Sequence, residues 1–166
     1  MSFPFTAWRL YCIALLFSCM LPHASAQAVR STPEQAKAMV KRAISYYREH
    51  GKEKAFARFN DPQGAFVKGD LYLFAFHLKG DGIQLVHGNN PKMLGKNVLD
   101  MRDADGKLII RAFIELANSP QGAGWVDYKW PHPLTKAQEI KTSYIERVDD
   151  IFIGCGAYKA TQSGTP

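Results

Sequence analysis

The segment from residue 70 to residue 78 places the strongest limit on how this chain can fold. Its side chains alternate with a period of two residues, which is the repeat of a β-strand. One alternating set is Tyr72, Phe74, Phe76 and Leu78, and the other is Leu71, Leu73, Ala75 and His77. Because both sets are mostly apolar, we expect a strand that is covered on both of its faces.

A tight hairpin is expected directly after this strand, because Asp81 and Gly82 form a strong turn signal. Residues 83–87 would then return antiparallel to the first strand. A two-residue loop pairs Phe76 with His87, and this register places the histidine on the aromatic face of the strand. The hairpin therefore brings a titratable ring beside a row of aromatic side chains.

A long helix is predicted before the sheet, over residues 33–50. Thr32 suits the N-cap, and Gln35 stands where the partner of a capping box belongs. Apolar residues then recur at helical spacing, and Gly51 supplies the stop. A second, short helix is expected near residues 55–59.

The rest of the chain carries loop, helix and strand signals in turn. Residues 88–106 are rich in turn-forming residues, and residues 108–117 have the length and apolar content of a helix. Three more strands are expected, at 125–130, 140–148 and 151–158. This order predicts an α+β domain with a mostly antiparallel sheet of about five strands and helices packed on it.

The N-terminus has the pattern of a secretory signal peptide over residues 1–26. Arg9 supplies the positive charge, residues 10–21 are apolar, and small residues precede a cleavage point before Gln27. The apolar run is too short for a permanent membrane span. The alternatives are an uncleaved membrane anchor and, more weakly, a lipoprotein modified at Cys19. We therefore expect a periplasmic or secreted protein, with membrane anchoring as the alternative location.

Residues 27–160 are expected to form one domain, followed by a flexible tail at residues 161–166. The whole chain has a formal net charge of +6, and the basic residues are spread along it without a run of like charges. This distribution does not suggest nucleic-acid binding. A modest positive balance is compatible with an anionic ligand.

No pattern in the sequence points to a catalytic or metal site. The histidines show no spacing typical of zinc ligands, and there is no nucleophile elbow or phosphate-binding loop. Residues 103–106 resemble the start of a calcium loop but lack its later ligands, so a plain turn is favoured. Cys155 is the single cysteine left after cleavage, and its apolar strand predicts a buried, inert thiol. We expect no cofactor, and a Cys155-dependent hydrolase is kept as a third reading.

Aromatic and amphipathic side chains on the later strands suggest a small-ligand pocket. Tyr128 and Trp130 share one face of their strand, and Lys141 and Tyr144 begin the next. Lys141 and Tyr144 are separated by an odd number of residues, so on a regular strand they point to opposite faces. We favour Tyr144 as the pocket residue, because a hairpin at residues 149–150 places it opposite Cys155.

These motifs together resemble the single Cache domain of type 2 (sCache_2) over residues 33–159. The segments that carry the resemblance are residues 51–56, 69–74, 81–82, 87–91 with 95–97, 103–106, 124–131, 141–144 and 154–158. The resemblance implies a PAS-like antiparallel sheet behind a long N-terminal helix. It also implies an extracytoplasmic sensor of the kind found in chemoreceptors and histidine kinases, often for small organic acids. This chain is most similar to free-standing exported members.

The resemblance and the residues together predict a non-enzymatic site for a small carboxylate. Lys141, or less favourably Arg111, would neutralise the charge of the ligand, while tyrosine and histidine side chains donate hydrogen bonds. The expected ligand-binding residues are Tyr72, His87, Tyr128, Trp130, Lys141 and Tyr144. A membrane-bound receptor or histidine kinase is the expected partner. The alternative is an interaction module that binds such a partner without a small ligand.

Overall fold

The computed structural model describes residues 30–159. The predicted signal peptide at residues 1–26 and the predicted tail at residues 161–166 lie outside the described residues, as does the cleavage point. The described part contains, in order, α1 (Pro33–His50), α2 (Lys52–Phe59), β1 (Val67–Lys68), β2 (Leu71–His77), β3 (Gln84–His87), η1 (Pro91–Met93), α3 (Ile109–Asn118), β4 (Ala123–Pro131), β5 (Gln138–Val148) and β6 (Ile151–Tyr158).

The first helix is bounded by the residues that the sequence predicts. The Thr32 hydroxyl accepts from the backbone N–H of Gln35, and the Gln35 side chain accepts in return from the N–H of Thr32. These bonds satisfy two N–H groups that a helix leaves free. At the other end Gly51 adopts a φ of 78°, a conformation that costs glycine little, and its N–H donates to the carbonyl of Tyr47. The predicted capping box and stop are confirmed.

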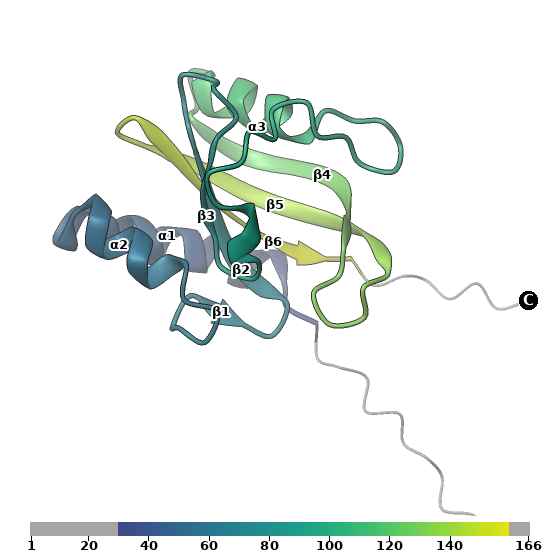
Figure 1. Ribbon diagram of the computed structural model, residues 1–166, viewed down its shortest axis with the longest axis horizontal. Helices are drawn as coiled ribbons and strands as arrows, with labels where there is room; N and C mark the ends of the chain where they lie inside the picture. Colours follow the sequence, from purple (N-terminus) through teal and green to yellow (C-terminus); the bar gives the residue numbers. More distant parts are fainter. Residues whose placement is uncertain (1–29, 160–166) are drawn as a thin grey trace, which may run out of the picture.

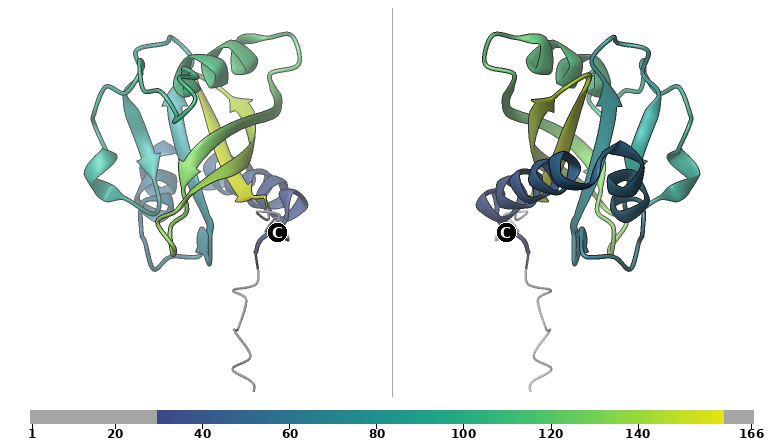
Figure 2. Two further views of the ribbon diagram at one scale, coloured as in Figure 1. Left: turned by 90° about the vertical axis from the view of Figure 1, so that its right-hand side faces the viewer. Right: turned by 90° about the vertical axis from the view of Figure 1, so that its left-hand side faces the viewer.

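The sheet has six antiparallel strands among the described residues, where about five were expected. The order is β1-β2-β6-β5-β4, and β3 pairs with β2 beside β1. The helix α1 lies across one face, while α3 lies against the other face near β4 (Figures 1 and 2). The expected α+β, PAS-like fold is confirmed. The extra strand is β1, which has only two residues and too little pattern to be recognised in sequence.

The two faces of the sheet belong to two apolar cores. The core beneath α1 contains Leu71, Leu73 and Ala75 of β2, together with the odd-numbered residues of β6. The core beneath α3 contains Phe74 and Phe76 of β2, Phe152 of β6 and Tyr128 of β4. All side chains from residue 71 to residue 76 are buried, which confirms that β2 is covered on both sides.

The predicted register of the first hairpin is wrong. His87 pairs with Phe74 instead of Phe76, and a bulge interrupts the ladder next to Phe76. The loop is longer than two residues because Ile83 pairs with Asn97 of the following segment, not with β2. Gly82 makes this possible, since it has a φ of 66° and packs against Leu99, where a Cβ would collide. A shift of two residues keeps the face, so His87 still lies with the aromatic set.

Candidate functional site

A small cavity of about 20 Å³ lies between the sheet and α3. Four of the six residues expected at the site line it, from three different strands: Tyr72, His87, Tyr128 and Trp130. The remaining walls are mostly apolar and include Phe74, Phe113 and Ile109. A cavity of this size has room for about one water molecule. Aromatic walls with a few polar groups are typical of a small-ligand site.

Lys141 lies on the same face of the sheet, directly below these rings. It pairs in the ladder with Tyr128 of β4 and Tyr158 of β6. Its Nζ lies 3.7 Å from the centre of the Tyr72 ring and 4.9 Å from that of Tyr158. The side chain is fully buried, and within residues 30–159 its Nζ has no hydrogen-bond partner. Burial lowers the pKa of Lys141 from 10.5 to about 7, because the charged form is deprived of water.

Two glycines of β6 make room for these side chains. A Cβ on Gly156 would lie 2.5 Å from Cε of Lys141 and would also collide with the Ser143 hydroxyl. A Cβ on Gly154 would collide with the ring of Phe74. At these two positions β6 has no side chain on this face of the sheet, so the side chains of Lys141 and Phe74 from the neighbouring strands pack directly on its backbone. Residues 154–158 are among the segments that carry the family resemblance, but no role was assigned to these two glycines from the sequence; their spacing of two residues in an apolar strand is a usable signal.

His87 is a neutral ring at the edge of the pocket. It stacks on Tyr72 with ring centres 5.0 Å apart. Its Nδ1 accepts from the backbone N–H of Asn90 at 3.1 Å, so in this tautomer Nε2 carries the proton and can donate. Burial, and to a smaller extent the charge of Lys141, lower the pKa of His87 to about 4. The ring is therefore a hydrogen-bond donor without charge at neutral pH.

The tyrosine hydroxyls form short hydrogen bonds around the same pocket. Tyr128 bonds to the Ser143 hydroxyl at 3.0 Å, and Tyr158 donates to the carbonyl of Pro131 at 2.9 Å. The hydroxyls of Tyr72 and Tyr158 are 3.4 Å apart. Burial raises the pKa of all three tyrosines, so their hydroxyls stay protonated. Tyr158 and Ser143 were not among the expected site residues.

Tyr144 lies on the opposite face of the sheet, so the expectation that it lines the pocket is wrong. It does pair with Cys155, as the predicted hairpin requires, but this register turns both side chains toward α1. The Tyr144 hydroxyl donates to Glu146 at 2.9 Å, and its ring packs on Trp125. Pairing with Cys155 correctly predicted that Tyr144 is buried, but it could not say on which face of the sheet the two side chains lie.

Two other candidates also lie away from the pocket. Arg111 is exposed on α3 and pairs with Asp100, with Nη2 and Oδ1 2.7 Å apart. Cys155 is fully buried, and its Sγ lies 3.7 Å from Sδ of Met39. Burial raises the pKa of the Cys155 thiol to about 12, which confirms the prediction of a buried thiol and argues against a nucleophile.

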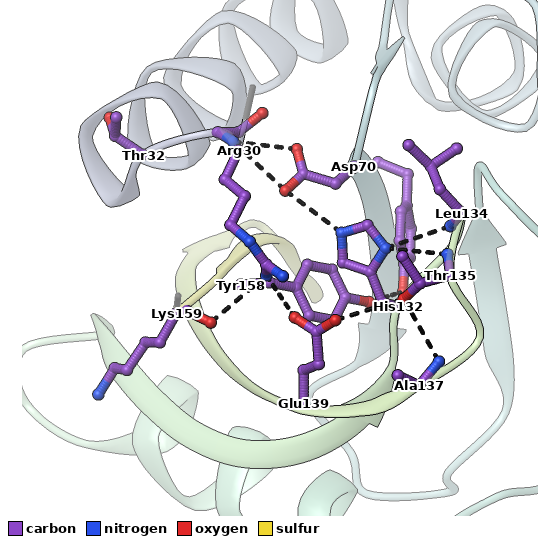
Figure 3. A network of polar contacts seen from close by, with 12 residues as sticks. Arg30, Thr32, Asp70, His132, Leu134, Thr135, Ala137, Glu139, Tyr158 and Lys159 are labelled. Carbon is purple, nitrogen blue, oxygen red and sulfur yellow. Dashed lines mark hydrogen bonds and ion pairs between the residues drawn. The ribbon is translucent and has the colours of Figure 1, made fainter. Parts of the chain in front are cut away.

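A second polar network joins the pocket to both ends of the described chain (Figure 3). His132 packs edge-on against Tyr158, and its Nε2 lies 3.9 Å from the Asp70 carboxylate. Asp70 in turn accepts from the backbone N–H of Ser31 at 3.3 Å. Arg30 pairs with Glu139 and also donates to the carbonyl of Lys159. The sequence alone does not indicate this network, because its members are far apart along the chain.

Residues 103–106 form a plain turn, as the sequence predicts. The Asp103 carboxylate accepts from the backbone N–H groups of Asp105, Lys107 and Lys129. These bonds occupy the carboxylate and attach the loop to the edge of β4. Among the described residues, no cluster of three or more histidine, cysteine or acidic side chains is arranged to hold a metal ion.

This chain belongs to the Cache domain family, whose model (dCache_2) matches residues 63–162. Cache domains are extracytoplasmic sensor modules of chemoreceptors and kinases. The family assigned from the sequence is thus confirmed, with the matching model named for the double rather than the single type of Cache domain.

Two curated proteins resemble part of the chain. Methyl-accepting chemotaxis protein McpP of Pseudomonas putida is 36% identical over 76 residues, which cover 45% of this chain and 14% of that protein. Sensor histidine kinase MctS of Rhizobium johnstonii is 33% identical over 91 residues, or 54% of this chain and 19% of that protein. The chain therefore spans less than a fifth of the length of these relatives.

Two solved structures share the fold. One is a methyl-accepting chemotaxis protein from Vibrio parahaemolyticus, with a TM-score of 0.64 and 24% identity over 75% of this chain and 86% of that chain. The other is a Cache chemosensory domain described in terms of carboxylic acid recognition, with a TM-score of 0.64 and 24% identity over 76% of this chain and 92% of that chain. Within residues 30–159, no helix is long and apolar enough to cross a membrane.

Proposed function

We propose that this domain is an extracytoplasmic, non-catalytic sensor for a small carboxylate of two to four carbons. The observation that carries the proposal is the buried Nζ of Lys141, which has aromatic contacts but no hydrogen-bond partner. An isolated buried ammonium is unfavourable, and a buried charge is normally paired. A ligand carboxylate is the partner that this site lacks.

The neighbouring groups suit the rest of such a ligand. The hydroxyl of Tyr72 and the Nε2–H of His87 are uncharged donors, and hydrogen bonds to an ionised acceptor are the strong ones. The hydroxyl proton of Tyr158 is already donated to the carbonyl of Pro131. The apolar walls beside Phe113 would accommodate a short carbon chain. Trp130 lines the cavity and would close its apolar side around a bound ligand.

Ligand binding would have to open the pocket. The cavity of about 20 Å³ is too small for a carboxylate of this size, so lining side chains must move when one binds. Tyr72 lines this cavity and Lys141 does not, so the Tyr72 ring must move for a ligand to reach the amine that lies against it. A ligand that binds the opened form shifts the population toward it, and a sensor requires such a shift.

The named relatives support this reading. One curated relative is a chemotaxis protein, another is a sensor kinase, and one structural neighbour is described in terms of carboxylic acid recognition. We infer that the domain acts in the periplasm or outside the cell, and that a membrane receptor or kinase is its partner. Cleavage of residues 1–26 would release it from the membrane.

A thermal-shift screen with small carboxylates tests the proposal. A ligand that binds only the folded state stabilises it by ~2.7 kcal/mol at a hundredfold excess over Kd. For a domain of this size that corresponds to a rise in Tm of several degrees. If millimolar acetate, glycolate, propionate and succinate all leave Tm unchanged, an interaction module that binds no acid replaces this proposal.

A further inference from the structure

The amine of Lys141 differs in its contacts from the amines of several lysines near the surface. Lys41, Lys129 and Lys159 each place Nζ within 2.8 Å of a carboxylate oxygen. Nζ of Lys141 instead contacts the faces of two aromatic rings and has no hydrogen-bond partner. No carboxylate of the described residues is hydrogen-bonded to this amine; the charge of Asp70 favours the ammonium only from a greater distance, and burial outweighs it.

A buried lysine without a counter-ion is a potential nucleophile, because its uncharged amine has a free electron pair. Enzymes that form Schiff bases with carbonyl compounds use lysines that are desolvated in apolar pockets. The pKa of about 7 leaves roughly half of Lys141 uncharged at pH 7, against about one in 3,000 for an ordinary exposed lysine. His87 and the tyrosines of the pocket are uncharged too, so they do not favour the ammonium.

We propose that Lys141 forms a reversible imine with the carbonyl carbon of a small 2-oxo acid. The proposal rests on the proposed function, because it narrows the carboxylate to one that also carries a carbonyl group. Nζ, which has no hydrogen-bond partner, becomes the site of a covalent bond. The two tyrosine rings whose faces contact Nζ exclude water from the amine and so favour its uncharged form.

The reaction needs no oxidant or reductant. The electron pair of the uncharged amine forms a C–N bond to the carbonyl carbon, and one N–H proton moves to the carbonyl oxygen, which gives a carbinolamine. The C–O bond then breaks, the hydroxyl leaves as water with the second N–H proton, and the C=N bond forms. Uptake of one proton from solvent then gives the protonated imine, and its positive charge pairs with the carboxylate of the ligand.

Reductive trapping tests the inference on the wild-type protein. Glyoxylate, the smallest 2-oxo acid, is added at pH 7 with cyanoborohydride, which reduces an imine to a stable amine. Peptide mapping by mass spectrometry then compares the rate of modification at Lys141 with the rates at exposed lysines of the same molecule. We expect Lys141 to be modified more than tenfold faster, with half of its maximal rate near pH 7. Glycolate, which has the same size but no carbonyl, serves as the matched control.

The outcomes separate this inference from the proposed function. If glyoxylate and glycolate raise Tm alike and Lys141 is modified no faster than exposed lysines, the imine is refuted and carboxylate sensing stands. If neither acid raises Tm and Lys141 stays unmodified, both proposals fail. Lys141→Arg keeps the positive charge without the nucleophile, so it should yield no adduct at this position. The rates of modification at Lys141 and at exposed lysines are both measured in the wild-type protein, so a folding defect in the variant does not affect the conclusion.

Discussion

Replacing Lys141 with methionine should make the ligand-free protein more stable. The change removes the buried amine while keeping most of the side-chain volume. Burial lowers the pKa of Lys141 from 10.5 to about 7, and one unit of pKa corresponds to ~1.4 kcal/mol. At pH 7 the buried amine therefore costs the folded state roughly 4 kcal/mol relative to water. Exchanging buried charges for apolar side chains of similar size has stabilised other proteins by about 1–4 kcal/mol, and we expect a gain in this range.

The sign of the pH dependence gives a second check on the same group. Between about pH 7 and pH 10.5 the unfolded chain holds a proton on Lys141 that the folded protein has largely lost. The free energy of unfolding of the wild type should therefore rise with pH across this window, by up to ~1.4 kcal/mol per pH unit from this group. Below pH 7 both states are protonated, and the contribution is constant. In Lys141→Met this contribution is absent.

Urea denaturation at pH 6, 7, 8 and 9 measures both effects, and the difference between wild type and variant isolates Lys141 from other titrating groups. Lys129→Met is the matched control, because Lys129 is an exposed lysine paired with Asp105 and its loss should change stability by less than ~1 kcal/mol. Carboxylates should also no longer raise the stability of the Lys141→Met protein. A Lys141→Met protein that is less stable than wild type at pH 7, or that still binds carboxylates equally well, would refute the reasoning.

Three further changes test other parts of the site. Gly156→Ala places a methyl group against Lys141 and Ser143, so we expect the free energy of unfolding in urea denaturation to fall by ~1–3 kcal/mol and carboxylate binding to weaken. If neither quantity changes, the side chains of Lys141 and Ser143 can move aside. Tyr72→Phe should weaken carboxylate binding by about 1.5–3 kcal/mol in calorimetry, whereas Tyr144→Phe, on the other face of the sheet, should leave it unchanged. The reverse order would mean that the pocket is on the α1 side. Cys155 should react slowly with a water-soluble thiol reagent in the native state and quickly after unfolding, because burial raises its pKa to about 12; fast native labelling would revive the nucleophile reading.

Local patterns were sufficient to predict most elements of the fold. The capping residues around Thr32 and the period of two in β2 depend on neighbours in sequence, and the structure has both where they were expected. The hairpin register failed because residues 82–84 pair with the segment near Asn97, a contact between separate parts of the chain. The turn signal at Asp81 depends only on neighbouring residues, so it cannot indicate that residues 82–84 pair with a different segment.

The candidate site was predictable only as a set of residue types. Tyr72, His87, Tyr128 and Lys141 meet because strands β2, β3, β4 and β5 are brought together by pairing over long separations. Sequence spacing correctly indicated that Lys141 and Tyr144 face opposite ways, but it could not say which face holds the pocket. That choice depends on where α1 packs, and α1 covers the Tyr144 side.

The pattern of β6 explains why the two faces differ so sharply. Its odd-numbered residues Ile151, Ile153, Cys155 and Ala157 fill the core beneath α1. On the other face the strand has Gly154 and Gly156, so the backbone itself is the floor, and Lys141 can cross it to reach the Tyr72 ring two strands away. A larger residue at either glycine would fill the space that Lys141 or Phe74 occupies. The same strand thus fills the core beneath α1 on one side and, because Gly154 and Gly156 have no side chains, leaves room for the buried amine of Lys141 on the other. Under the proposed function, a bound carboxylate would offset the free-energy cost of burying that amine.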